Sequence, residues 1–169
     1  MKAASCLPIL LALVVAPRAM ADGPCLTPRD LARLDRDQLD AVFAAGATPE
    51  PPVGFGRGRI LLRVDGKMPR VRARLQGLAW KGKVFHADGT FVNQWTGFQA
   101  IASHVEAGPS WYDGRPCLVL AYPPGAPVFG NARDELREVA PGLWLGRFYA
   151  VCPCGHLEGY FALEITCEK

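Results

Sequence analysis

The sequence predicts a mainly β protein, an antiparallel barrel of about nine strands with one N-terminal helix. Two observations favour this fold class. Apolar and polar residues alternate with a period of two in many short runs after Arg59, which is typical of strands with one buried face. The pairs Asp65-Gly66, Asp88-Gly89 and Asp113-Gly114 fall between such runs, and Asp-Gly supplies the tight turns of hairpins. A long meander closes on itself to remove exposed edges, so we expect a barrel, with a β-sandwich as the alternative.

Residues 1–21 have the pattern of a signal peptide. Lys2 precedes an apolar run over residues 7–16, and Ala19-Met20-Ala21 is the small-x-small sequence that signal peptidase accepts. The run is shorter than the roughly 20 residues that span a bilayer. We therefore expect cleavage near Ala21 and export to the periplasm or the medium, with an uncleaved anchor as the alternative.

Residues 22–58 are predicted to form a helix followed by a Pro/Gly-rich linker. Thr27 is suited to cap the helix, Pro28 to its first position, and Gly46 to end it. The apolar residues between them approximate one stripe, so we expect the helix to pack on the barrel.

Residues 59–169 are predicted to be the barrel domain. The expected strands lie near residues 59–64, 70–76, 80–87, 90–95, 100–106, 117–122, 134–140, 143–151 and 157–166. Pro141-Gly142 and the segment Cys152-Pro-Cys-Gly-His156 are expected to be two further turns. No second helical pattern separates the strands, which argues against a βαβ architecture.

The charge and the cysteines limit the function classes. Removal of residues 1–21 takes away Lys2 and Arg18 and lowers the net charge from +3 to +1, so bulk charge does not predict a nucleic-acid partner. Five cysteines then remain, and an odd number allows at most two disulfides within the chain. The disulfide candidates are Cys25, Cys117, Cys152, Cys154 and Cys167. Strand direction permits Cys117 to pair with Cys167, which leaves Cys25 to pair with Cys152 or Cys154.

The cluster of Cys152, Cys154 and His156 raises the question of a metal or haem site. Its spacing differs from Cys-x-x-Cys-His, and no second ligand pair for structural zinc lies elsewhere. We interpret the segment as a disulfide-bonded turn and expect no metal and no cofactor. No nucleophile elbow or phosphate-binding loop is present, which argues against an enzyme. A thiol or metal enzyme using Cys154 and His156 is a weaker alternative.

Aromatic and polar residues on several strands are candidates to line a cavity. Asn93 and Trp95 share one face of their strand with Phe91, and His104 and Arg137 are candidate polar anchors. The full set of ligand-binding candidates is Trp80, Asn93, Trp95, His104, Trp111, Tyr122 and Arg137. A solid core is the alternative, because small barrels can fill with side chains.

The segment around Arg137 is expected to bury charge in either register. If Leu136 points inward, Asp134 and Glu138 do so too; the other register takes Glu135 and Arg137 inward. Such burial requires pairing or a wet interior. An edge strand with two exposed faces is the alternative.

A basic run covers residues 57–83. Adjacent strands could gather Arg59, Arg63, Arg70, Arg72 and Arg74 on one outer surface. This surface could meet an anionic membrane, and the alternative is that the charges protect strand edges from pairing.

The order of elements resembles the lipocalin-like, or calycin, barrels. The likeness rests on Gly54 and Gly58 in "VGFGRGRI", on "LAWKGKVF" and on "GLWLGRF", and it covers residues 39–166. It includes the branch marked by Gly-x-Trp-x-Gly, with Gly56 here in place of the Trp. The resemblance implies a cavity for a lipid or another apolar molecule. We therefore expect an exported small-ligand-binding protein, and the alternative is an envelope-associated structural protein that docks through its basic surface.

Overall fold

A computed structural model describes residues 26–64, 69–122, 132–150 and 155–165. The predicted signal peptide, Cys25, the Asp65-Gly66 pair, Cys152, Cys154 and Cys167 lie outside these residues. The elements in order are α1 (Pro28–Leu31), α2 (Arg36–Ala45), β1 (Gly54–Arg63), α3 (Pro69–Ala79), β2 (Trp80–Phe85), β3 (Thr90–Trp95), β4 (Phe98–Pro109), β5 (Pro116–Ala121), β6 (Ala132–Ala140), β7 (Leu143–Ala150) and β8 (His156–Ile165).

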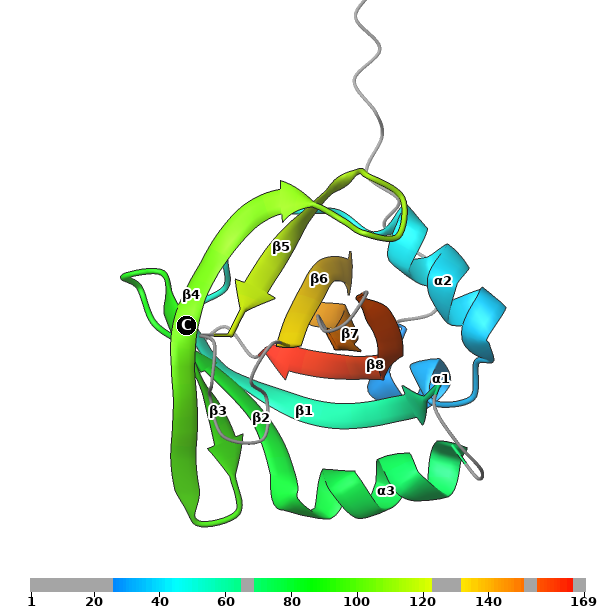
Figure 1. The fold of residues 1–169 in the computed structure, drawn as a ribbon, viewed down its shortest axis with the longest axis horizontal. Helices are drawn as coiled ribbons and strands as arrows, with labels where there is room; N and C mark the ends of the chain where they lie inside the picture. Colours follow the sequence, from blue (N-terminus) through cyan, green and yellow to red (C-terminus); the bar gives the residue numbers. More distant parts are fainter. Residues whose placement is uncertain (1–25, 65–68, 123–131, 151–154, 166–169) are drawn as a thin grey trace, which may run out of the picture.

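The strands form a closed antiparallel barrel of eight, which confirms the predicted fold class (Figure 1). Each strand pairs with its sequence neighbour, and β1 closes the barrel by pairing with β8. Asp88-Gly89, Asp113-Gly114 and Pro141-Gly142 join β2 to β3, β4 to β5 and β6 to β7, as predicted. The three glycines at these turns have φ angles between +71° and +79°, which other residues adopt at a cost.

One of the nine predicted strands, at residues 70–76, is wrong, because these residues belong to the helix α3. β1 pairs directly with β2 on one side and with β8 on the other, so the segment between β1 and β2 has no free strand edge to join. Its Arg, Ala, Leu and Gln residues are good helix formers, and Pro69 suits the first helical position. Figure 1 shows α3 along the outside of the barrel beside β1.

The N-terminal region forms two helices where one was predicted. Thr27 caps α1 in a capping box with Asp30, and Pro28 occupies the first turn. Asp35 then starts α2 through a second capping box with Gln38. The chain therefore turns between the helices and places both of them against the outside of the barrel (Figure 1).

The barrel has two apolar cores, one inside it and one beneath the N-terminal helices. Side chains of alternate strand residues, such as Phe91, Leu120 and Leu163, fill the interior. Leu39 and Phe43 of α2 pack with outward-facing residues of β5, β7 and β8 in the second core. The barrel wall between these cores is thus buried on both faces, which is why polar residues on β6 are buried in either orientation.

Among the described residues, no helix has the length and apolar composition needed to cross a bilayer.

Candidate functional site

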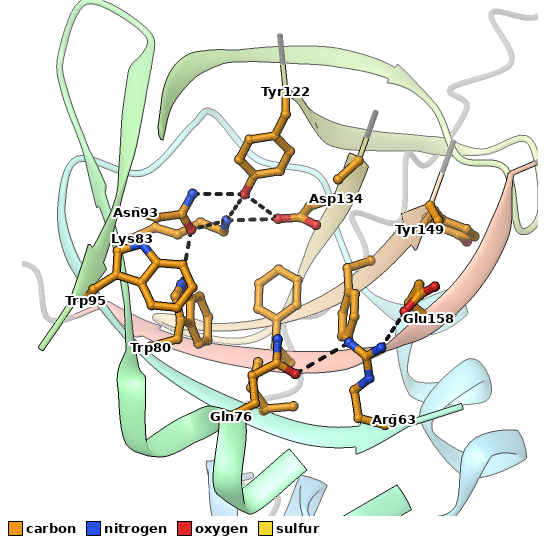
Figure 2. Close-up of a pocket in the computed structure, with 15 residues that line it drawn as sticks. Arg63, Gln76, Trp80, Lys83, Asn93, Trp95, Tyr122, Asp134, Tyr149 and Glu158 are labelled. Atoms are coloured by element: carbon orange, nitrogen blue, oxygen red, sulfur yellow. Dashed lines mark hydrogen bonds and ion pairs between the residues drawn. The ribbon is translucent and has the colours of Figure 1, made fainter. Parts of the chain in front are cut away.

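The barrel interior contains a cavity of about 300 Å³ (Figure 2). Its walls combine aromatic rings with polar side chains from seven of the strands and helices. The lining residues are Ile60, Arg63, Gln76, Trp80, Lys83, Asn93, Trp95, Tyr122, Ala132, Asp134, Phe148, Tyr149, Ala150, Glu158 and Phe161. An aromatic-walled hollow with a few polar groups is the usual form of a small-molecule site.

A β-bulge determines which residues of β2 face this cavity. The pairing of β2 with β3 runs from Trp80↔Trp95 to Gly82↔Gln94, so one extra residue is accommodated on β2. Trp80 and Lys83, three positions apart, therefore both line the cavity. A regular strand would have sent one of them to the outside.

Lys83 lies at the centre of a buried polar cluster formed with Asn93, Tyr122 and Asp134. Its Nζ donates to Asn93 Oδ1 at 2.9 Å and to Tyr122 Oη, and lies 2.9 Å from Asp134 Oδ2. A lysine ammonium has three donors, and these three acceptors satisfy them. Figure 2 shows the four side chains converging on one wall of the cavity.

Further hydrogen bonds tie this cluster together, among them one from Asn93 Nδ2 to Tyr122 Oη at 3.2 Å. Tyr122 Oη donates to Asp134 Oδ2 at 2.9 Å, and Trp80 Nε1 donates to Asn93 Oδ1 at 3.1 Å. Burial raises the pKa of Tyr122 well above its ordinary value, and the Asp134 charge adds to the effect. Tyr122 is therefore a neutral donor at physiological pH.

The Lys83 ammonium also lies within an aromatic cage. Its Nζ is 5.0–5.7 Å from the ring centroids of Trp80, Phe91, Tyr122 and Phe161. The side chain is 2% exposed, and this burial lowers its pKa while the charge of Asp134 opposes the shift. The rings and the carboxylate together stabilise a charge that the apolar interior would otherwise exclude.

A second ion pair lies at a more exposed side of the cavity. Arg63 pairs with Glu158, and its Nη1 also donates to Gln76 Oε1 of α3 at 3.4 Å. The Arg63 guanidinium lies 5.0 Å from the centroid of the Phe148 ring. Each ion pair of the cavity therefore has no net charge. Through Gln76, α3 forms part of the cavity wall.

Four of the seven predicted ligand-binding residues line the cavity. These are Trp80, Asn93, Trp95 and Tyr122. Lys83 and Asp134 complete the polar cluster, but only Asp134 could have been anticipated from the sequence, through the register in which Leu136 points inward.

His104, predicted as a polar anchor, does not line the cavity. Ile101 and Val105 of β4 pack against the interior core, so His104 lies on the exposed outer face of the same strand. The sequence around His104 does not show which face of β4 is buried. The inward packing of Ile101 and Val105 determines that face.

Trp111 lies outside the barrel, on the turn between β4 and β5. Its ring is half-exposed and packs edge-on against Tyr149, with 5.3 Å between the centroids. The predicted position in the cavity is therefore wrong for this residue.

Arg137 is buried on the outside of the barrel, beneath α2. Leu136 faces the interior core, so Arg137 faces the opposite way and packs 4.5 Å from the centroid of the Phe43 ring. Its guanidinium donates to both carboxylate oxygens of Asp113, at 2.7 and 2.8 Å. These bonds lower the pKa of Asp113, because they stabilise its charged form.

Glu135, two residues before Arg137 on the same face of β6, is likewise buried and is paired beneath the β4–β5 turn. It accepts from Ser110 Oγ at 2.6 Å, from the Trp111 backbone N–H at 2.7 Å and from Arg133 Nε at 3.0 Å. β6 therefore buries charge on both of its faces, and each charge has partners, which explains the dense charge pattern of this strand.

The predicted basic surface forms only in part: Arg59, Arg70 and Arg74 line one groove, and Arg63 does not lie on it. Arg63 lies in the wall of the cavity, whereas Arg59 is exposed on the outer face of β1. Arg70, Arg72 and Arg74 belong to α3, so they do not lie on a strand beside β1 as predicted.

Cys117, a disulfide candidate, is a free thiol in this structure and is completely buried in the core beneath the N-terminal helices. Cys167 and the other three candidates lie outside the described residues. The apolar surroundings raise the pKa of the Cys117 thiol to about 12, and Glu135 adds to the shift.

We expect Cys117 to resist alkylation in the folded protein. The thiolate is the reactive form, and a rise in its pKa from 9.0 to about 12 lowers the thiolate fraction about a thousandfold at neutral pH. Iodoacetamide labelling followed by peptide mapping should leave Cys117 unmodified in the native protein and modified after denaturation in urea. Rapid labelling of the native protein, or a disulfide-linked Cys117 peptide, would contradict this expectation.

Within the described ranges, no group of three or more His, Cys, Asp or Glu side chains is placed to hold a metal ion. His156 instead pairs with Glu158 on β8, with 2.8 Å between His156 Nε2 and Glu158 Oε1. Its predicted neighbours Cys152 and Cys154 are outside these ranges.

Comparisons with known proteins identify the fold alone. No protein-family model matches the chain, and no curated protein matches it. A crystal structure of a protein from Thermomonospora curvata is similar, with a TM-score of 0.54 and 17% sequence identity, over 79% of this chain and 88% of that one. The identity is low, so the likeness supports the barrel and says nothing of what it binds.

Proposed function

We propose that this protein binds a small, neutral, largely apolar molecule inside its barrel. The observation that carries the proposal is the cavity of about 300 Å³ with aromatic walls and one buried polar cluster. Such a combination supplies apolar contact for most of a ligand and a few hydrogen bonds that orient it. The lipocalin-like resemblance of the sequence leads to the same class of function.

The charges of the cavity favour a neutral ligand. Lys83 is paired with Asp134, and Arg63 with Glu158. An ionised ligand would bring an unpaired charge into a site whose own four charges compensate one another, and the cost of desolvating that ligand would be poorly repaid. A fatty acid carboxylate is therefore a poorer match than an alcohol, an amide or an aromatic amine.

The polar cluster favours a ligand with a hydrogen-bond donor. Lys83 and Tyr122 both contact Oδ2 of Asp134, and a carboxylate offers about four acceptor positions. Asp134 can therefore accept from a ligand O–H or N–H while it holds Lys83. The cavity is at the small end of the range for ligand sites, so we propose a compact ring system or a short chain.

Native mass spectrometry of the protein purified without detergent tests this proposal directly. A bound mass that is lost on denaturation is the expected result, and its identity would name the ligand. If no mass is retained, titration with phenylnaphthylamine, a neutral aromatic probe with one N–H, provides the second test. Its fluorescence should rise on binding and that of Trp80 and Trp95 should be quenched, since both rings line the cavity.

Replacing Ala132 with phenylalanine is expected to weaken probe binding at least about tenfold, because the added ring occupies the space of the ligand. Ala102→Phe is the matched control, since it adds the same ring to an exposed position on β4 and should leave the affinity unchanged. Thermal melts of both variants establish that they fold. If both variants bind the probe equally well, the interior is not the site. The same conclusion follows if none of the three proteins, including the wild type, shows saturable binding.

A further inference from the structure

Helix α3 presents an apolar stripe to solvent. Val71, Leu75 and Leu78 are 48%, 63% and 69% exposed. Their spacing of four and three residues places them on one face of the helix. Three large apolar side chains in a row are seldom left in water without a binding partner.

The orientation of α3 is fixed by the opposite side of the helix. Ala73 is buried there, and Gln76 lines the cavity and accepts from Arg63. Arg70 anchors the start of the helix by donating to the backbone carbonyls of Ala32, Arg33 and Leu34. The apolar stripe therefore cannot turn inward without the loss of these contacts.

Positive charge borders the stripe. No Asp or Glu occurs between Gly66 and His86, whereas this segment holds six Lys and Arg residues. A groove of about 610 Å³ between α1, β1 and α3 runs along one side of the stripe. Its basic lining residues are Arg29, Arg33, Arg59, Arg70 and Arg74, and Val71 and Leu78 line it as well.

We propose that α3 docks the protein on the surface of an anionic phospholipid bilayer, with its apolar stripe in the interface and the arginines on the lipid phosphates. A helix that combines an apolar face with flanking basic residues is the form that lies in the plane of a membrane surface. Figure 1 shows α3 on the outside of the barrel, so the whole length of the helix can meet a flat surface.

The charge pattern selects this occupant over a second copy of the chain. A symmetric dimer through α3 would place the arginine-lined grooves near one another, and like charges repel. Lipid phosphates instead complement the arginines, and each Lys or Arg near such a surface strengthens binding. The proposal goes beyond ligand binding in the barrel and does not depend on it.

Vesicle flotation tests the docking. The protein should float with vesicles that contain phosphatidylglycerol and stay in solution with vesicles of phosphatidylcholine alone, and added salt should reduce the bound fraction. The double variant Leu75→Gln/Leu78→Gln should bind the anionic vesicles at least about tenfold more weakly, because it removes two side chains that enter the interface. Arg74→Gln should weaken binding about fivefold.

Two matched variants serve as controls. Trp111→Gln removes an exposed apolar side chain from the β4–β5 turn, which lies across the barrel from α3 in Figure 1. Arg36→Gln removes an exposed arginine from α2. Both should bind like the wild-type protein. The proposal would be overturned if the protein does not bind vesicles, binds them regardless of lipid charge, or still binds them after the double leucine substitution. Binding to polyglutamate without binding to vesicles would also overturn it and would indicate an acidic protein partner.

Discussion

Replacing Lys83 with methionine is expected to lower the free energy of unfolding by about 3–5 kcal/mol, the usual cost of removing one partner of a buried ion pair. Asp134 would lose its cationic partner in an apolar interior, and Tyr122 would be the remaining partner of its Oδ2 in the cluster. The aromatic cage would also lose the cation that its rings surround. Urea denaturation followed by tryptophan fluorescence measures the change.

Two further variants separate the effect of charge from that of packing. Lys83→Met combined with Asp134→Asn should regain most of the lost stability, since no unpaired charge remains and the amide oxygen can still accept from Tyr122. Lys81→Met, at an exposed position of the same strand, should change stability by no more than about 0.5 kcal/mol. If Lys83→Met is no more destabilising than Lys81→Met, the buried ion pair of Lys83 and Asp134 does not stabilise the fold.

Replacing Gly82 with alanine is expected to cost at least about 3 kcal/mol, because strain and a steric clash add at this position. Gly82 has a φ angle of +138°, and a Cβ there would lie 1.9 Å from the Gly56 carbonyl oxygen on β1. β1 and β2 approach each other so closely that no side chain fits between them. The same urea denaturation experiment gives the size of the effect.

Gly89→Ala separates the two contributions. Gly89 also has a positive φ angle, +79°, but a Cβ there meets no atom within 4 Å. Its substitution should cost only the roughly 1–2 kcal/mol of the backbone conformation. Equal costs at both positions would mean that the close approach of β1 and β2 contributes nothing.

Gly82 matters to the candidate site because it forms part of the bulge that directs both Trp80 and Lys83 inward. Gly82→Ala should therefore also change the tryptophan emission and weaken probe binding in any protein that still folds. A variant that keeps wild-type emission and affinity would show that the bulge is not needed for the cavity.

The parts of the site that periodicity could predict are those on regular strands. Asn93 and Trp95 lie two residues apart on β3, and the structure places both in the cavity wall. Lys83 was missed because the bulge changes the inward phase within β2, and a pattern of strict alternation contains no sign of such a change. The sequence allows Asp134 to face either side of β6. The structure packs Leu136 inward, so Asp134, two residues earlier, also faces the interior.

The misplaced residues have a common cause. Arg137 is a candidate anchor of the interior in one of the two registers of its strand, but α2 creates a second buried surface outside the barrel. His104 has no feature of its own that distinguishes the two faces of β4. In both cases a neighbour distant in the sequence decides which face is buried.

The amino-acid sequence by itself determined the antiparallel strands, most of their bounds, the turns at Asp-Gly and Pro-Gly, and the start at Thr27 and end at Gly46 of the N-terminal helical region. These features depend on interactions between residues a few positions apart, so local pattern is enough to find them. Only the tertiary structure decided that residues 69–79 form a helix, that Trp80 and Lys83 point the same way, and that β6 is buried on both faces. Each of these depends on which strand edges and surfaces are already occupied by distant parts of the chain, because pairing and burial are properties of the closed barrel and not of any one segment.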